Sequence, residues 1–319
     1  MQVTHGTIQA KGGPSRFRCA LTIGNFDGVH RGHRAMLDRL VQKSRELKLA
    51  SSVLTFEPHP REFFAPAAAP ARLSRVREKL ELIAEAGVDR AHVLRFGAPL
   101  AAMPPERFVE DVLVRGLGVS WLLVGRDFRY GARRAGDFGA LEAAAAAAGF
   151  GLEAMPDVLQ EGERVSSSAI RSALAQGDLA GAARLLGRPY SMSGRVAHGE
   201  RLGAKLGFPT ANIVLRRRPP LEGVYVVVAE LEETHVPEET QLRLQGVASV
   251  GRRPTVRENA APLLEVHLFD WTEALYGRHL RVTFLRKLRA EEKYDGLEAL
   301  RAAIARDAGQ ARDYFRTHG

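Results

Sequence analysis

The stretch "CALTIGNFDGVHRGHRAML", residues 19–37, joins an apolar run to a glycine-rich turn and then to a segment with helical periodicity. This succession is typical of a β-strand that leads into an α-helix. In α/β folds such a junction lies at the carboxyl edge of a parallel sheet, where ligands bind. The stretch therefore predicts a parallel sheet and a ligand site at its edge.

The same alternation continues to about residue 186. Candidate strands cover residues 19–24, 51–56, 90–96, 120–125 and 150–155. Candidate helices lie near residues 33–48, 75–87, 105–116 and 137–149, followed by two short ones near 168–186. Strands that alternate with helices predict an α/β domain whose parallel sheet is covered on both faces.

Beyond residue 187 the pattern becomes rich in strands. Candidate strands cover residues 190–197, 225–231, 244–251, 263–270 and 280–288, and an amphipathic helix starts near Glu291. Such a set predicts a small closed or partly closed antiparallel barrel with a C-terminal helix. We place the domain boundary near Gly187, which gives domains of residues 1–186 and 187–319.

Composition limits the class of protein. The chain has 319 residues, 45% of them apolar, and this is enough for about two folded domains. A net charge of +9 favours anionic partners, but the absence of any run of five like charges weakens a nucleic-acid role. One cysteine, Cys19, and no apolar segment of membrane-spanning length make a cytoplasmic protein the expectation, with no membrane partner.

The first candidate site is the glycine-rich turn itself. Helix N-termini offer unpaired N–H groups and a positive dipole end, so an anion is the favoured ligand. His30 and His33 are three residues apart and project from nearby faces. Two imidazoles there can donate to phosphate oxygens and stabilise the charge that develops at an α-phosphorus. A single histidine in this position is more often a solvated first-turn residue, and two alone make a weak metal site.

Three further motifs follow at the same edge of the predicted sheet. "EPHP" holds His59 between two prolines, "VGRDFRYG" follows the fourth strand, and "SSSAIR" opens a late helix. The serines can cap that helix and Arg171 adds a cation one turn in. Four such motifs at one sheet edge make a phosphate site more convincing than any one of them alone.

In this order, the four motifs resemble the nucleotidyltransferase module of bacterial bifunctional riboflavin kinase/FAD synthetases. The resemblance implies a Rossmann-like domain in which the phosphate of FMN attacks the α-phosphorus of ATP and pyrophosphate leaves. It implies that ATP and its phosphates contact Gly24, Asn25, Phe26, Asp27, Gly28, His30, His33, Ser167, Ser168 and Arg171. It implies that the flavin side is lined by Phe56, His59 and Pro60, and that Asp127, Phe128 and Arg129 lie by the flavin or the adenine.

Two positions depart conservatively from that pattern. Tyr130 stands where phenylalanine is common, and Ser168 stands where threonine is common. Both keep the aromatic or hydroxyl character, so neither threatens the assignment.

The second candidate site needs a phosphate cradle of its own kind, because the chain contains no GxxxxGK[ST] and no GxGxxG. In "HGERLGAKLGFPTAN", residues 198–212, a proline-fixed turn precedes Thr210 and Asn212. A hydroxyl and an amide oxygen suit a hard cation such as Mg²⁺. An ordinary barrel loop has the same Gly and Pro content, and this alternative stays open on the loop alone.

A carboxylate on a strand supplies the base. In "LLEVHLFD", alternation puts Leu264, Val266 and Leu268 on one face and Glu265 on the other. Such a glutamate can take the proton from a primary alcohol that attacks a γ-phosphorus. A surface glutamate would show the same alternation, so strand pattern alone does not decide between the two.

"GFPTAN", "LEGVYVV", "GVASVGRRPTV", "LEVHLFDWTEALYG" and "LRAEEKYDGLEAL" resemble, in this order, the riboflavin kinase module of the same family. The resemblance implies a six-stranded barrel with Glu265 as the base for the 5′-hydroxyl of riboflavin. It implies Mg–ATP contacts at Gly199, Gly207, Pro209, Thr210, Asn212 and Tyr225, with Mg²⁺ on Thr210 and Asn212. Arg289, Glu291 and Tyr294 would line the flavin, and Tyr294 replaces a usual phenylalanine.

Other positions depart more strongly. Ala204 stands where an arginine is common, so the phosphate contact of that arginine is lost unless Arg201 or Lys205 supplies it. Arg252 and Arg253 replace smaller or neutral residues, and the sequence gives no role for them.

The leading hypothesis is an enzyme that phosphorylates riboflavin to FMN and adenylylates FMN to FAD, with Mg²⁺ and ATP in both reactions. One alternative keeps the nucleotidyltransferase chemistry but changes the acceptor, as in cytidylyltransferases. Another is a nucleic-acid-binding module, which predicts salt-sensitive binding to polynucleotide and no flavin turnover.

Overall fold

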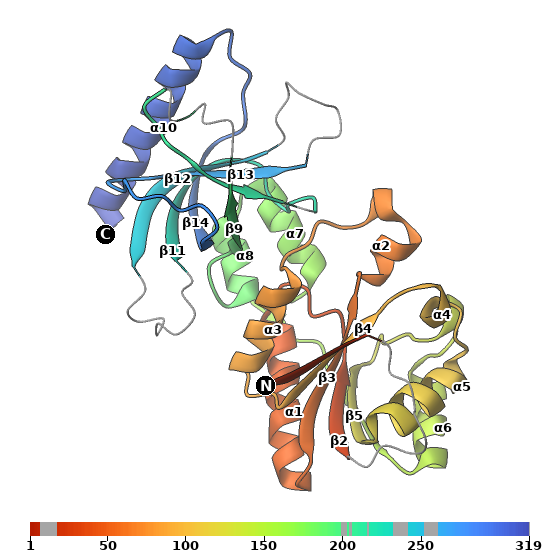
Figure 1. The fold of residues 1–319 in the computed structure, drawn as a ribbon. Coiled ribbons are helices and arrows are strands. Elements are labelled where there is room, and N and C mark those ends of the chain that lie inside the picture. Colours follow the sequence, from red (N-terminus) through yellow and green to blue (C-terminus); the bar gives the residue numbers. More distant parts are fainter. Residues whose placement is uncertain are drawn as a thin grey trace. The chain divides into compact units, whose positions relative to one another are not determined.

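The computed structural model describes residues 1–6, 18–198, 203, 206–215, 217–231, 242–251 and 261–318. Contacts between residues divide the chain into two compact units. The first unit is Met1–Pro70 with Val76–Ser166, and the second is Ala71–Arg75 with Ser167–Gly319. In Figure 1 the first unit contains a sheet flanked by helices, and the second contains a barrel with a long helix against it.

The first unit is built on a parallel six-stranded sheet with the order β1-β4-β3-β2-β5-β6. Its strands are β1 (Gln2–Gly6), β2 (Cys19–Ile23), β3 (Ala50–Glu57), β4 (Arg90–Arg95), β5 (Val119–Gly125) and β6 (Gly151–Met155). The predicted α/β fold is confirmed. The exposed edge strand β1 was not predicted, because "QVTHG" contains no apolar run.

Helices cover both faces of this sheet (Figure 1). One face packs on α1 (Arg31–Leu47) and α3 (Val76–Glu85), which bury residues such as Leu37, Leu40 and Ile83. The other face packs on the π-helical segment η2 (Phe108–Leu117) and on α6 (Phe138–Ala148). The shorter elements are α2 (Pro60–Phe64), η1 (Pro66–Ala68), α4 (Ala98–Ala101), α5 (Pro105–Arg107), η3 (Ala132–Arg134) and the hairpin β7 (Leu159–Gln160) with β8 (Glu163–Arg164).

The strand order creates a switch point at the carboxyl ends of β2 and β5. The chain passes from β2 to β3 on one side and later returns from β4 to β5 on the other. The connections therefore diverge at this place, and doubly wound sheets bind ligands in the resulting crevice. The loop that begins at Gly24 and the loop that begins at Arg126 both leave the sheet there.

The second unit holds α7 (Ser167–Gln176), α8 (Leu179–Leu186) and a closed antiparallel barrel with the order β10-β13-β12-β11-β14-β9. Its strands are β9 (Ser191–Ala197), β10 (Ala211–Val214), β11 (Gly223–Leu231), β12 (Arg243–Gly251), β13 (Leu263–Leu268) and β14 (His279–Arg289). The expected barrel is confirmed. Strand β10 was not predicted, since four residues carry too little alternation to stand out.

The last helix, α10 (Leu297–His318), begins later than predicted, and the expected start near Glu291 is wrong. Residues 290–296 are irregular, and Gly296 adopts φ +141°, which no helix contains. α10 buries Ala303, Ala308 and Ala311, and the last two join the apolar cluster formed with Val224 and Phe269. None of the helices in the described ranges is long and apolar enough to span a membrane.

Candidate functional site

The loop after β2 turns sharply before α1. Phe26, Gly28 and Val29 adopt φ values of +50°, +84° and +38°. Residues other than glycine rarely adopt positive φ values, and β-branched residues do so least of all. The backbone of this loop is therefore strained, and the surrounding structure must hold it in place. Phe26 is fully buried and Val29 nearly so, and both belong to the core under α1.

A buried cation lies against this loop. Lys79, on α3, is 1% exposed, and its Nζ donates to the carbonyl oxygen of Asn25 and to Oγ1 of Thr55, each at 3.0 Å. The Thr55 hydroxyl donates to the same carbonyl at 3.2 Å. Two donors from different elements therefore fix the Asn25 peptide at the start of the strained turn.

The two histidines lie face to face. His30 caps α1, and its Nδ1 accepts the backbone N–H of His33 at 3.2 Å. The two rings stack with their centroids 3.7 Å apart and their planes 14° apart. Burial, followed by the nearby charges of His30 and Lys79, lowers the pKa of His33 well below its usual value. His33 is therefore neutral near pH 7, and His30 is buried instead of solvated.

Two polar atoms at the junction of this loop and α1 have no hydrogen-bond partner among the described residues. Asn25 Oδ1 and His33 Nδ1 are buried and make no hydrogen bond within the described part of the chain. Buried polar groups are almost always paired, so these two atoms, one in the loop and one in the first turn of α1, indicate where a ligand binds. Across the described ranges, no three His, Cys, Asp or Glu side chains gather at metal-binding distance.

His59 is held by its own helix cap after β3. Its Nδ1 accepts the N–H of Arg61 at 3.1 Å, and its backbone N–H donates to Glu62 at 3.2 Å. This capping box buries both side chains and starts α2 at Pro60. The arrangement fixes the direction in which α2 leaves the sheet edge.

An aromatic cluster beside this cap was missed by the sequence reasoning, apart from Phe56. The ring of Phe96, after β4, lies edge-on to Phe56, Phe63 and Phe64 at centroid distances of 5.9, 5.7 and 5.7 Å. Phe64 is 64% exposed. Exposed rings that gather at a ligand-binding sheet edge provide a surface for a planar ligand. The signal was available in "REFF", where two phenylalanines follow the His59 motif directly.

The loop after β5 carries the remaining residues predicted for this flavin side. Asp127 pairs with Arg164 at 2.9 Å, and Arg129 pairs with Asp137 at 3.0 Å. Phe128 lies between them in sequence and stacks on Tyr130, with centroids 5.7 Å apart. The loop therefore presents two charged pairs, anchored through Tyr130 to the core.

Ser167, Ser168 and Arg171 lie on the first turns of α7, which belongs to the second unit. The Nε of Arg171 donates to the carbonyl of Ala71 at 2.6 Å, also in the second unit. Their contact with the phosphates of ATP stays a prediction.

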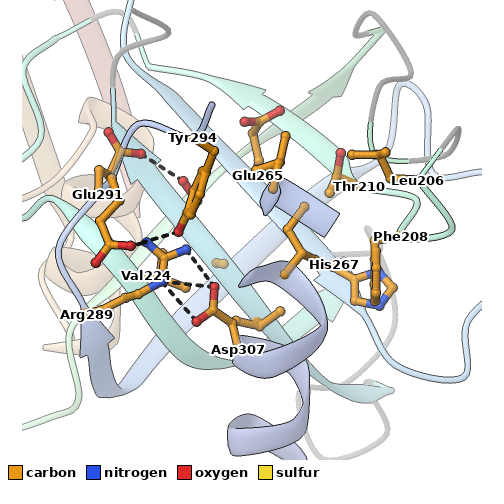
Figure 2. Close-up of a pocket in the computed structure, with 17 residues that line it drawn as sticks. Leu206, Phe208, Thr210, Val224, Glu265, His267, Arg289, Glu291, Tyr294 and Asp307 are labelled. Carbon is orange, nitrogen blue, oxygen red and sulfur yellow. Dashed lines mark hydrogen bonds and ion pairs between the residues drawn. The ribbon is translucent and has the colours of Figure 1, made fainter. Parts of the chain in front are cut away.

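The barrel unit contains a pocket of about 290 Å³ between the outer face of the barrel strands β12 and β13 and the helix α10. Figure 2 shows its side chains converging from the strands and from the helix. The pocket brings together five residues that the sequence predicted, namely Thr210, Glu265, Arg289, Glu291 and Tyr294. It also includes residues that the sequence reasoning missed, among them Phe208, Ser249, His267, Leu300, Ile304 and Asp307.

Strand register sets the polar face of this pocket. In β13, Leu264, Val266 and Leu268 are buried, whereas Glu265 points to the opposite face, as the alternation predicted. Glu265 pairs in register with Asn212 on β10 and with Ser249 on β12. Directly opposed residues on neighbouring strands share a face at about 5 Å, so these three side chains form one row.

The amide of Asn212 has an unused acceptor. Its Nδ2 donates to the carbonyl of Thr210 at 3.4 Å, while its Oδ1 is buried without a partner in the described ranges. An orphaned amide oxygen next to a hydroxyl and opposite a carboxylate fits a hard cation. The donor set thus suits the Mg²⁺ that the sequence predicted.

Among the described residues predicted for the kinase site, Gly207, Pro209, Asn212 and Tyr225 do not line the pocket. Gly207 forms a turn with φ +88°, and the Pro209 carbonyl accepts Nδ1 of His267 at 2.9 Å. Tyr225 lies fully buried in the barrel core, where its hydroxyl donates to the Glu222 carbonyl. Gly199, Arg201, Ala204, Lys205, Arg252 and Arg253 lie outside the described residues. The ATP contacts expected at Gly199, Gly207, Pro209 and Tyr225 stay predictions.

Glu291 lies close to the row of Glu265 and Ser249. Its carboxylate accepts the Ser249 hydroxyl at 2.9 Å. Burial, together with the charges of Glu222 and Glu265, raises the pKa of Glu291 despite that hydrogen bond. The pocket therefore concentrates negative charge at one end, where a cation or a proton is favoured.

Comparisons with known proteins match two consecutive stretches of the chain to two families. Residues 14–169 match the family described as FAD synthetase, and residues 186–315 match the family described as riboflavin kinase. The bifunctional riboflavin kinase/FMN adenylyltransferase of Escherichia coli K12 is 48% identical over 299 residues, which cover 93% of each chain. The protein of the same name from Pseudomonas fluorescens is 47% identical over 313 residues, which cover 98% of this chain and 97% of that one.

A solved structure described as a macrolide-efflux protein from Streptococcus pneumoniae shares the fold. Its TM-score is 0.77 at 25% sequence identity, and the match covers 98% of this chain and 99% of that one. Two distinct enzyme families match consecutive parts of the chain. Relatives whose names give both activities are 47% and 48% identical to it over at least 93% of each chain. The chain therefore belongs to the bifunctional riboflavin kinase/FMN adenylyltransferase family.

Proposed function

We propose that residues 187–319 phosphorylate riboflavin to FMN and that residues 1–186 adenylylate FMN to FAD, both with ATP. The observation that carries this proposal is the match of two consecutive stretches to two different enzyme families. The geometry of each unit supports it, since each presents orphaned polar atoms beside the groups that its reaction needs. The basic excess of the chain suits substrates that are anions.

In the kinase reaction, Glu265 takes the proton of the riboflavin 5′-hydroxyl. The freed oxygen attacks the γ-phosphorus of ATP, the bond from that phosphorus to the bridging oxygen breaks, and ADP leaves. Thr210 and Asn212 would hold Mg²⁺, which neutralises phosphate charge when it is bound. The row formed by Asn212, Glu265 and Ser249 supports this assignment, since it sets the base beside the cation donors.

In the adenylyl transfer, a phosphate oxygen of FMN attacks the α-phosphorus of ATP, and the bond to the β-phosphate oxygen breaks as pyrophosphate leaves. No proton has to move, so the protein contributes positioning and charge stabilisation. Neutral His33 offers one N–H to this charge, and His30 lies stacked against it. The N-terminus of α1 adds its dipole.

The flavin of the adenylylation reaction would lie against the aromatic cluster of Phe56, Phe63, Phe64 and Phe96. The capping box of His59 and Pro60 fixes α2, which carries two of these rings. Stacking on aromatic side chains suits the planar isoalloxazine ring. Asp127 and Arg129 would line its edge from the loop after β5.

A cytoplasmic location and the absence of nucleic-acid partners are part of the same proposal. One cysteine in the chain fits a reducing compartment. The proposal assigns the basic excess to ATP and flavin phosphates, so polynucleotide should not bind specifically.

One incubation tests the function. Purified protein is incubated with riboflavin, ATP and Mg²⁺, and the flavins are separated by chromatography. FMN followed by FAD is the expected result, and EDTA in excess of Mg²⁺ should stop both steps. Absence of both products, together with salt-sensitive polynucleotide binding, would establish the nucleic-acid alternative.

A further inference from the structure

An ion pair joins the last helix to the wall of the kinase pocket. Asp307, near the middle of α10, is 5% exposed. Its carboxylate accepts Nε of Arg289 at 3.0 Å and Nη2 of Arg289 at 2.7 Å. Figure 2 shows Asp307 reaching the guanidinium from the helix side. A bidentate pair of this kind fixes the orientation of the arginine as well as its position.

The third nitrogen of the same guanidinium is also engaged. Arg289 Nη1 donates to the carbonyl of Ala290 at 2.9 Å and lies 3.9 Å from Glu292. Each nitrogen of Arg289 therefore has a partner within the protein. The side chain cannot turn toward a substrate without giving up bonds to Asp307 or to the backbone, so its contribution to the pocket is made in this orientation.

Arg289 in turn supports residues 290–296, which connect β14 to α10. The ring of Tyr294 lies over the guanidinium at 5.7 Å, and the Tyr294 hydroxyl donates to Glu292 at 3.0 Å. Glu291 bonds to Ser249 on the barrel. This connection has no helix or strand of its own, so these side-chain contacts determine the shape of the pocket wall that Glu291, Glu292 and Tyr294 form.

Asp307 lies on the face of α10 that lines the pocket. Leu300, Ile304 and Asp307 are spaced at i, i+4 and i+7, and all three line it. A well-packed apolar pair often stabilises a fold as well as a buried ion pair does. A buried carboxylate among apolar neighbours, bound bidentately to a pocket residue, is therefore better explained by a role in the site than by fold stability.

We infer that Asp307 is a positioning residue of the kinase site, which orients Arg289 and through it the 290–296 wall against which the flavin binds. The inference rests on the proposed kinase function. Asp307 acts on riboflavin binding and not on phosphoryl transfer, because the proposed base Glu265 lies on β13 and the proposed cation donors Thr210 and Asn212 lie at β10, whereas the ion pair joins β14 to α10. The adenylylation unit contains neither partner of the ion pair.

The test is Asp307→Asn in the full chain, with Asp313→Asn as the matched control. Asp313 lies on the same helix but is exposed and pairs only with Arg316 among the described residues. We expect the KM for riboflavin to rise about tenfold or more in Asp307→Asn, with kcat changed less than about twofold, because a charge-assisted bidentate contact is lost. Asp307→Glu should recover part of the KM, and Asp313→Asn should match the parent.

A double-mutant cycle tests whether Asp307 acts through Arg289. Arg289→Gln and the double variant Arg289→Gln/Asp307→Asn should show the same KM for riboflavin, because Asp307 has nothing left to orient. If the fold increase in KM of the double variant equals the product of the fold increases of the two single variants, the residues act independently and the inference is overturned.

Three further outcomes have a clear meaning. Equal KM values in Asp307→Asn and Asp313→Asn overturn the inference, as does a loss of kcat with unchanged KM. A fall in thermal stability of the second unit without a change in KM shows a purely structural pair and also overturns it. If the parent protein forms no FMN at all, the proposed kinase function has failed, and this is recognised before any variant is made.

Discussion

The two units hold their reactive groups in different ways. In the first unit, a strained loop between β2 and α1 leads into the two histidines at the start of α1, and a buried lysine fixes the Asn25 peptide of that loop. In the second, strand register in a closed barrel sets Glu265 beside Asn212, and an ion pair shapes the opposite wall. The histidines and the loop before them are contiguous in the chain, although Thr55 and Lys79 anchor the loop from a distance, whereas the pocket residues themselves come from segments far apart in the chain. Substitutions in and around the loop should therefore remove activity at the first site. At the second site, activity should also depend on the strand pairing and on the ion pair that shape the pocket.

The largest effect should come from removing the base. Glu265→Gln should lower FMN formation by about 10²- to 10⁴-fold, the usual contribution of a positioned proton acceptor. Conversion of added FMN to FAD should continue, because the other unit performs it. Separate assays of both reactions, with Glu230→Gln on β11 as the control, measure this. Normal FMN production would remove Glu265 as the base.

The histidine pair should give the next largest effect, in the other unit. His30→Ala with His33→Ala should lower FAD formation by about 10²- to 10³-fold, since charge stabilisation at the phosphorus is lost. FMN should still accumulate from riboflavin. His5→Ala, on the exposed strand β1, is the control. A parallel loss of both activities would contradict two independent sites.

A third variant probes the anchor of the loop. Lys79→Met should lower kcat for FAD formation by about tenfold, because misplacement of reacting groups by a fraction of an ångström is costly. Thr55→Val, which removes the second donor to the Asn25 carbonyl, should give a smaller loss in the same direction. Lys43→Met, on the surface of α1, is the control. Unchanged kcat in both test variants would show that the strained loop needs neither donor.

A smaller effect is expected at the aromatic cluster. Phe64→Ala should raise the KM for FMN by about two- to tenfold, the loss expected for one aromatic contact. Stability should change little, because the ring is largely exposed. Leu159→Ala, which removes a similarly exposed apolar side chain from the same unit, serves as the control. A KM equal to that of the control would place the flavin elsewhere.

The smallest effect concerns pH and the stability of the first unit. The pKa of His33 is lowered in the folded state, mainly by burial. Below the usual histidine pKa, the unfolded chain therefore binds a proton at His33 that the folded chain does not bind. The free energy of unfolding should therefore fall as pH drops below about 6.5, by at most about 1.4 kcal/mol per pH unit for one proton. Above that pH it should level off.

This pH dependence can be measured on one unit alone. The chain has two tryptophans, Trp121 in the first unit and Trp271 in the second. In a Trp271→Phe background, fluorescence reports the unfolding of the first unit. Adding His33→Gln should flatten the decrease below about pH 6.5, and an unchanged slope would show that another group titrates there.

The fold could be predicted from the sequence wherever pattern and burial coincide. The buried runs of β2 and β5 gave the parallel sheet, and the alternation of residues 263–268 gave the face of Glu265. The strands β1 and β10 were not predicted. An exposed edge strand has no apolar run, and a strand of four residues is too short for alternation of apolar and polar residues to be recognised. The irregular connection before α10 was predicted as helix, because exposed charged residues are common in helices and in loops alike.

The histidine site could be predicted because its residues are neighbours in the chain. Lys79 and Asp307 could not be assigned in that way, although a signal existed for both. Lys79 lies one turn before Ile83 on the buried face of α3, and Asp307 lies one turn after Ala303 on the buried face of α10. A charged residue on an apolar helix face indicates a buried partner, but the sequence does not tell which one.

The register of β13 also determines where this chain can change length. β13 is paired on both sides, with β10 and with β12, so inserting or deleting one residue within it would turn Glu265 toward the core and Leu264 toward the pocket. An insertion or deletion of two residues would leave Glu265 facing the pocket but move its carboxylate out of register with Asn212. Within β13, length variation of either kind would therefore abolish phosphorylation even where the barrel still closes, whereas substitutions that keep the length can leave the barrel and the base in place.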